Sequence, residues 1–225
     1  MNDSHESALQ PMTSSPRPAT ARARASEARR QTILDAALSL FSQFGLHGAS
    51  LDAIAELAGV SKTNLLYHYA SKETLYLAVF ARILSCWQVP MELICAETPP
   101  EIAIRRYIQQ KLELARDQPQ ASRLYCLEVI QGAPLLGKVL AEQRSLMAEK
   151  ARAVQQWIDS GQLAPVDPYH LIYLLWSTTQ HYADFAVQIQ AISDQDLSDP
   201  TFFAASVDNV QRIVLGGLLP RSEKA

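Results

Sequence analysis

Apolar residues recur with helical spacing through almost the whole chain after its first thirty residues, and this periodicity restricts the fold more than any other feature. The first long periodic segment stops at Gly45, and glycine commonly ends a helix because it accepts left-handed backbone angles. Two later segments begin with Asp167-Pro168 and Asp199-Pro200, in which Asp can cap a helix and Pro fits its first turn. Because no useful stretch alternates like a strand, the sequence predicts an all-α protein with about nine helices.

Composition limits the kinds of molecule that this chain can be. The 225 residues are 48% hydrophobic, which is enough for a sizeable core and argues against global disorder. The formal net charge is −3, so any surface that binds nucleic acid must be local. The three cysteines are odd in number and lack a CxxC spacing, which argues against a disulfide framework or a zinc site. No signal peptide or uninterrupted apolar span is visible, so a cytoplasmic protein without a membrane segment is expected.

The N-terminal residues 1–28 lack the helical periodicity and are rich in Ser, Pro, Ala and Arg, so they are expected to form a disordered arm. Five arginines and one glutamate fall between positions 17 and 30, a local charge of 5 − 1 = +4. Two interpretations stay open for this basic arm: a solvated tail, or a segment that touches the phosphates or the minor groove of DNA.

Hydrogen-bonding residues gather in the stretch from Leu51 to Glu73, which reads LDAIAELAGVSKTNLLYHYASKE. Gly59 separates two short apolar segments at a point where the chain must turn sharply. Ser50 can cap the first segment as a helix, and Ser61 can cap the second. The residues expected to turn inward are Val60, Leu65 and Leu66, and those expected to face outward are Lys62, Thr63, Asn64, Tyr67 and His68.

Two short helices of this kind, joined at a glycine, are typical of a helix-turn-helix whose second helix enters the major groove of DNA. Lys, Asn and Thr suit hydrogen bonds to base edges, whereas Tyr and Lys suit phosphates. The start of the second helix itself favours a phosphate. The alternative is an ordinary helical hairpin with a polar outer face, which the concentration of donors at the helix start disfavours.

The stretch GASLDAIAELAGVSKTNLLYHYASKETLYLAV, together with the helix before it, resembles the TetR-type transcriptional repressors. The likeness is most specific over residues 32–80, where the glycine, the YHY sequence and the SKE sequence all fall in place. It implies that Tyr67 and Lys72 contact phosphates, and that residues 29–75 bind double-stranded operator DNA while residues 76–225 bind a ligand and dimerise. The candidate DNA-binding residues are Ser50, Lys62, Thr63, Asn64, Tyr67, His68 and Lys72.

Segments of the C-terminal part, such as KLELARDQPQASRLYCLEVIQGAPLL and LAPVDPYHLIYLLWSTTQHYADFAVQ, resemble the pyrimidine-sensing members of that family. The resemblance implies a repressor of pyrimidine catabolism that releases its operator on binding uracil or thymine, with no cofactor besides this effector. The alternative is a TetR-type repressor that senses another small planar or aromatic metabolite. An enzyme is disfavoured because GxSxG, Walker, GxGxxG and HExxH motifs are absent from the sequence, which leaves no catalytic candidate.

Uracil is a planar ring with two N–H donors and two carbonyl acceptors, so aromatic faces and amides are the side chains expected to hold it. The Gln180 amide could pair with one donor and one acceptor at once. Trp87, Trp176 and Tyr125 could supply stacking faces. Arg123 could donate to a ring carbonyl, although an exposed helical arginine is the commoner case.

The segments that follow Pro168 and Pro200 carry apolar residues on more than one side. A helix with two apolar faces must be packed on both of them, and two such helices suit an isologous four-helix interface. The sequence therefore predicts a homodimer through its last two helices. The alternative is that all of these faces belong to the core of a single chain.

Overall fold

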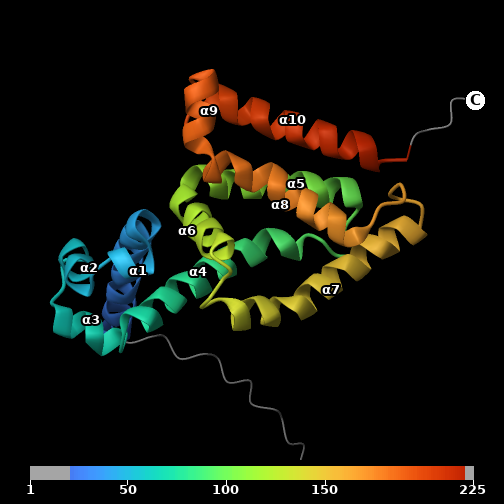
Figure 1. The fold of residues 1–225 in the computed structure, drawn as a ribbon. Helices are drawn as coiled ribbons and strands as arrows, with labels where there is room; N and C mark the ends of the chain where they lie inside the picture. Colours follow the sequence, from blue (N-terminus) through green and yellow to red (C-terminus); the bar gives the residue numbers. More distant parts are fainter. Residues whose placement is uncertain (1–20, 221–225) are drawn as a thin grey trace, which may run out of the picture.

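A computed structural model describes residues 21–220, with the side chains of Lys138 and Glu142 left out (Figure 1). Ten helices and no strand form within this range, which confirms the all-α fold and lies close to the expected number of helices. Their bounds are α1 (Ala21–Gly48), α2 (Leu51–Leu57), α3 (Lys62–His68), α4 (Lys72–Glu92), α5 (Pro100–Asp117), α6 (Pro119–Ile130), α7 (Gly137–Asp159), α8 (Pro168–Asp184), α9 (Ala186–Ser193) and α10 (Pro200–Leu218).

The helix-turn-helix forms as expected between α2 and α3. The hydroxyl oxygens of Ser50 and Ser61 cap these helices by accepting hydrogen bonds from the third backbone N–H that follows each of them, at 3.1 Å. Gly59 has a φ of +64° in the turn between them, and Gly45 interrupts α1 with a φ of +66°. Glycine adopts these angles without the clash that a Cβ would cause.

The start of α1 corrects the expected extent of the N-terminal arm. The helix begins at Ala21, so residues 21–28 are helical rather than disordered. The physical reason lies in their composition, because the ARARASEA sequence follows the last proline of the arm and consists largely of good helix formers. Residues 1–20 lie outside the described part of the chain, and the role of the basic arm stays a prediction.

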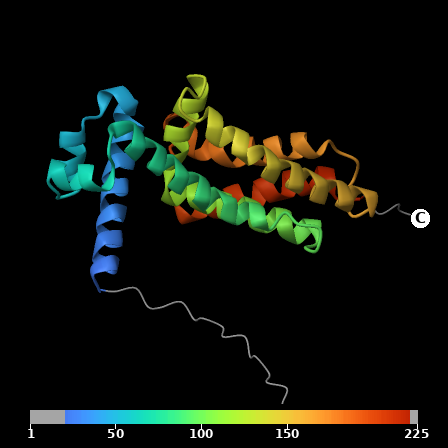
Figure 2. The same cartoon turned by 90° about the horizontal axis from the view of Figure 1, so that it is seen from below.

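Two hydrophobic cores hold the fold together. We call α1–α3 and the first half of α4 the head, and α5–α10 the body; α4 runs from one to the other (Figures 1 and 2). The head core includes Phe41, Ile54 and Leu65, but it also takes in Ala121 and Leu124 from α6. The family-implied division near residue 75 therefore falls within a continuous helix, and the head core extends into the body.

α4 is the one helix among residues 21–220 whose length and mean hydropathy of 1.2 would allow it to cross a membrane. Its apolar residues are divided between the head core and the body core, which is how a buried helix of a globular fold behaves. Arg82, near its middle, forms an ion pair with Asp35 of α1 at 2.6 Å. Pro90 lies inside α4 shortly before the helix ends at Glu92.

The C-terminal helices differ in one respect from the expected pattern. The helix that starts at Pro168 ends at Asp184, and after a break at Phe185 the separate helix α9 begins. α8 and α10 both pack on α5 through one side. α8 also packs on α6 and α7, and both helices keep an exposed face with large apolar residues: Tyr173 and Leu174 on α8, and Ile213 on α10. These exposed faces support the predicted homodimer.

If the predicted homodimer forms through α8 and α10, substitution of Ile213 by Glu should separate it without unfolding the chain. Ile213 is 67% exposed on α10, so the change costs little within one chain. A two-fold axis would bring the new charge into the interface from both subunits. Sedimentation velocity should then show half the wild-type mass, with unchanged helix content by circular dichroism. The matched control is Ile130→Glu, another exposed isoleucine, which should stay dimeric; a dimeric Ile213→Glu protein would contradict the proposed interface.

Candidate DNA-binding helix and ligand pocket

The exposed face of α3 carries most of the residues expected to bind DNA. Tyr67 is 82% exposed, and Lys62 and Thr63 are also exposed. The Nζ atom of Lys62 donates to Asp52 Oδ2 of α2 at 2.9 Å. Both side chains of this pair remain largely exposed, so the bond is weak and a phosphate could replace it.

Three residues of α3 are placed differently from the expectation. Leu66 is 38% exposed rather than buried, because residues three and four apart share a helical face and Leu66 therefore lies beside Lys62 and Thr63. Asn64 and His68 are partly buried rather than fully outward. They are four residues apart on one edge of α3, and Asn64 Oδ1 is buried without a hydrogen-bond partner among the described residues.

Lys72 and Ser50 have structural contacts besides any contact with DNA. The Nζ atom of Lys72 donates to the backbone oxygens of Ala49 at 3.0 Å and His47 at 3.5 Å, where the chain leaves α1. An ammonium group at carbonyls that end a helix is favourable. Ser50 accepts the capping bond with its oxygen, which leaves its hydroxyl hydrogen as a donor.

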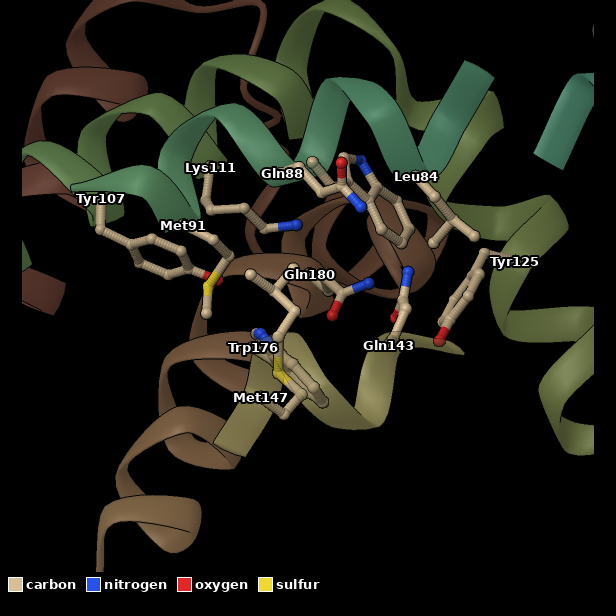
Figure 3. A pocket seen from close by; sticks show the side chains of 12 residues that line it. Leu84, Gln88, Met91, Tyr107, Lys111, Tyr125, Gln143, Met147, Trp176 and Gln180 are labelled. Atoms are coloured by element: carbon tan, nitrogen blue, oxygen red, sulfur yellow. The ribbon is translucent and has the colours of Figure 1, made fainter. Parts of the chain in front are cut away.

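A small, partly open cavity lies where α4, α5, α6, α7 and α8 meet (Figure 3). Its volume is about 60 Å³, room for roughly four to six waters. The polar ends of Lys111, Gln143 and Gln180 point toward its middle (Figure 3). The residues that line it are Leu84, Trp87, Gln88, Met91, Tyr107, Lys111, Tyr125, Gln143, Leu146, Met147, Trp176 and Gln180.

Four of the five predicted ligand residues come together in this cavity: Trp87, Tyr125, Trp176 and Gln180. The rings of Trp87 and Tyr125 meet edge to face, with centroids 4.9 Å apart. Arg123 does not join them. It lines a separate, more open groove and its Nε donates to the Pro119 backbone oxygen at 3.4 Å. Arg123 and Tyr125 are two positions apart, so their side chains point to different sides of α6. They therefore cannot both line the same cavity.

Lys111 is the main residue that sequence reasoning missed. It is 5% exposed, and its Nζ lies 4.3 Å from the centroid of the Trp87 ring. Burial lowers the pKa of Lys111 to about 8, against the opposing effect of the Asp184 carboxylate. A signal for it exists in the sequence, because Lys111 stands four residues after Tyr107 in an otherwise apolar helical stripe.

The cavity thus combines aromatic walls with several hydrogen-bonding groups. The amides of Gln88, Gln143 and Gln180 can each donate and accept, and the ammonium of Lys111 can only donate. Tyr107 lies at one side of the cavity and is fully buried. Burial raises the pKa of its hydroxyl, and a hydrogen bond with Trp176 opposes this effect. Such a site suits an uncharged planar ring that carries carbonyl oxygens and N–H groups. Gln88 from α4 and Gln143 from α7 add two amides that were not foreseen.

Comparison with known proteins agrees with this architecture. The family model for bacterial regulatory proteins of the tetR family matches residues 33–79, and that for the C-terminal region of YcdC-like proteins matches residues 80–221. The HTH-type transcriptional regulator RutR of Escherichia coli O157:H7 is 52% identical over 201 residues, covering 89% of this chain and 95% of RutR. The Shigella flexneri protein of the same name is 51% identical over the same coverage.

Solved structures show the same fold. A TetR family transcription regulator from Marinobacter aquaeolei VT8 superposes with a TM-score of 0.67 at 20% identity, covering 88% of this chain and 99% of that one. A TetR-like regulator from Rhodococcus sp. RHA1 gives 0.61 at 23% identity, covering 84% and 94%. The relatives are transcriptional regulators, not enzymes. From the helix-turn-helix, the domain matches and the identity to RutR, we conclude that this chain belongs to the TetR family of bacterial transcriptional regulators.

Proposed function

We propose that the chain acts in the cytoplasm as a homodimeric repressor of pyrimidine catabolism, which releases operator DNA when uracil or thymine binds. The observation that carries the proposal is the body cavity, where two amides and an ammonium group point between aromatic rings. The high identity to RutR over nearly the whole chain supports the same assignment. No cofactor besides the effector is needed for binding and release.

The chemistry of the cavity matches that of a pyrimidine-2,4-dione. Gln180 can accept from one ring N–H and donate to the adjacent carbonyl, and Gln143 can do the same at a second edge. Lys111 donates to a carbonyl oxygen, for which a charged donor gives a stronger hydrogen bond than a neutral one. Trp87 and Trp176 provide apolar faces for the ring.

The small size of the cavity favours a small planar effector over a large one. The cavity volume of about 60 Å³ is below the roughly 150 Å³ of a cavity that binds benzene, so even a single six-membered ring would need some lining side chains to move. A larger planar metabolite, such as a fused bicyclic compound, would need several of the lining side chains to move. A different single-ring metabolite remains the alternative effector, and binding assays against unrelated aromatic compounds separate the two.

The DNA-binding proposal rests on the exposed face of α3 and the residues at its edges. Lys62 and Thr63 stand at the start of α3 and are the proposed contacts to base edges, and Tyr67 and Lys72 are the proposed contacts to phosphates. Ser50, at the start of α2, offers a hydroxyl donor for the backbone. Asn64 and His68 contribute only through their exposed atoms, since both are partly buried.

Release would follow from the geometry of α4. Trp87 at its far end lines the cavity, and Lys72 at its near end holds α1 in the head. These residues are separated by fifteen positions, or about 22 Å of helix. A ligand that shifts the far end therefore tilts the head, and the two heads of a dimer lose the spacing that successive major grooves require. Such a ligand stabilises the non-binding dimer and shifts the population toward it.

Loss of Lys72 should weaken DNA binding and head stability together. We expect Lys72→Ala to bind all operator variants more weakly and to lower the salt slope by about 1, as for any lost phosphate contact. Because its hydrogen bonds to Ala49 and His47 also disappear, the free energy of unfolding should fall by about 1 kcal/mol. The control Lys62→Ala should affect DNA binding alone. Gel shifts and urea denaturation measure both effects, and a Lys72→Ala change confined to one operator position would contradict the phosphate role.

Loss of Gln180 should remove the effector response and leave operator binding intact. Gln180→Ala deprives a pyrimidine of one donor and one acceptor, at about 1–3 kcal/mol for each group left unpaired in a buried site. Calorimetry should show uracil binding weakened about tenfold or more. The control is Gln155→Ala, an exposed glutamine of α7, which should behave as wild type. Release of DNA from Gln180→Ala at the wild-type uracil concentration would place the effector site elsewhere.

The pH dependence of effector binding should report Lys111. Its pKa of about 8 means that the ammonium form dominates below that pH and is lost above it. Since a ligand carbonyl favours the charged form, thymine affinity should be full near pH 7 and fall as the pH rises through about 8. Lys111→Met should bind more weakly at pH 7 and give a flat profile over this window, by calorimetry. An equal pH dependence in both proteins would show that the ligand alone titrates.

A further inference from the structure

Two contacts join α4 to α6, one at the cavity and one at the head. At the cavity, Trp87 of α4 meets Tyr125 of α6. At the head, the hydroxyl of Tyr76 on α4 donates to Glu128 Oε2 on α6 at 2.9 Å. Tyr125 and Glu128 are three residues apart, less than one turn of the same helix. If α6 moves as a rigid helix, a displacement of Tyr125 at the cavity therefore moves Glu128 at the Tyr76 contact by nearly the same distance.

Tyr76 is anchored in the head. It is buried, and its ring packs edge to face against Phe41 of α1 and Phe80 of α4, each with centroids 4.9 Å apart. Its hydroxyl is its link to Glu128, and burial together with this carboxylate raises the pKa of Tyr76. The tyrosine thus stays protonated and acts as a hydrogen-bond donor over the physiological range.

Glu128 is a charged residue that the fold buries with few partners. It is 4% exposed. Its Oε1 accepts from the backbone N–H of Leu135, at 3.1 Å, in the loop between α6 and α7. Its own backbone oxygen accepts from Ala133, which holds a φ of +52° in that loop. The Glu128 carboxylate therefore joins the head, α6 and the loop that leads into α7, the helix that supplies Gln143 to the cavity.

A buried carboxylate that loses a hydrogen-bond donor is destabilised. The contact between Glu128 and Tyr76 therefore favours a few distinct positions of α6 relative to α4 over a continuous range of positions. Apolar contacts around it would tolerate small shifts, because the hydrophobic effect has no direction. The Tyr76–Glu128 hydrogen bond does not, because it weakens steeply with angle and distance. This directional bond restricts how α4 and α6 can shift relative to one another at this point.

We propose that Tyr76 and Glu128 are the positioning residues that couple the body cavity to the DNA-binding head. They bind neither DNA nor effector. They determine how strongly a conformational change at the cavity changes the position of the head, and the reverse. The role of the cavity as effector site rests on the proposed function, but transmission from head to body is independent of which molecule the cavity binds.

The tryptophans allow this transmission to be measured without any effector. All three, Trp87, Trp157 and Trp176, lie outside the head, and two of them line the cavity. Binding of DNA to the head changes their fluorescence only if the body responds. The probe is a duplex selected from a randomised pool by the wild-type protein, titrated into the full chain at fixed salt.

We expect wild type to show a saturable fluorescence change on binding this duplex. Tyr76→Phe removes one hydroxyl, and it should reduce the amplitude at full DNA occupancy to less than about a third, as should Glu128→Leu. Glu128→Gln should retain most of the amplitude, because its amide can accept from Leu135 and donate to the Tyr76 oxygen. The matched control Glu113→Gln changes a carboxylate of α5 that is paired with Gln109, and it should behave as wild type.

A second arm measures the effector. The factor by which uracil weakens DNA binding should fall in Tyr76→Phe from the range of about 5–150 typical of allosteric proteins to about 1–2. A purely structural role would lower the melting temperature and leave both readouts unchanged. Full fluorescence amplitude in Tyr76→Phe, or no change in wild type, would overturn the coupling. If uracil fails to bind wild type while the fluorescence arm behaves as expected, the effector assignment is wrong and the coupling stands.

Discussion

The packing of α6 into the head core is the interaction on which the rest of the structure depends. Leu124 and Ala121 of α6 are buried with the apolar residues of α1 and α4, and a buried leucine contributes about 1.5–3 kcal/mol. The helix-turn-helix therefore has no core that is complete without the body. A large displacement of α6 must repack this shared core or carry the head with it, and a DNA-binding unit built in this way is sensitive to events in the body.

The cavity holds a buried charge whose desolvation is unfavourable. Lys111 is charged at neutral pH although burial disfavours its charge, as the lowered pKa records. The Trp87 ring face and the distant Asp184 carboxylate compensate only in part. A ligand carbonyl that accepts a hydrogen bond from the ammonium would reduce this unfavourable free energy. Because the buried charge is already present in the free protein, its relief adds to the affinity for such a ligand. The same reasoning explains selectivity, because an amino group in place of the carbonyl would set donor against donor.

Some residues serve stability and function together, which sequence patterns do not separate. Lys72 was predicted as a phosphate contact, yet it also holds the carbonyls at the end of α1. Arg123 was predicted for the ligand and lies in another groove, since helix geometry turns it away from Tyr125. Lys111 was not among the predicted ligand residues, and it proves to be buried in the cavity. In each case the outcome depended on which neighbouring helix covers the side chain.

The sequence by itself determined the features that depend on interactions between residues close together in the chain. Helical period, serine and Asp-Pro caps, and the glycines at positions 45 and 59 predicted the all-α fold and the helix-turn-helix, because caps and turns act within a few residues. Four residues of the cavity were also recognisable by type: Trp87, Tyr125, Trp176 and Gln180. Only the tertiary structure decided that Trp87, Lys111, Gln143 and Gln180 share one cavity. It also decided that Tyr76 meets Glu128, fifty-two positions away. Such contacts are set by how helices cross, and crossing is fixed by the packing of whole faces rather than by any short stretch of sequence.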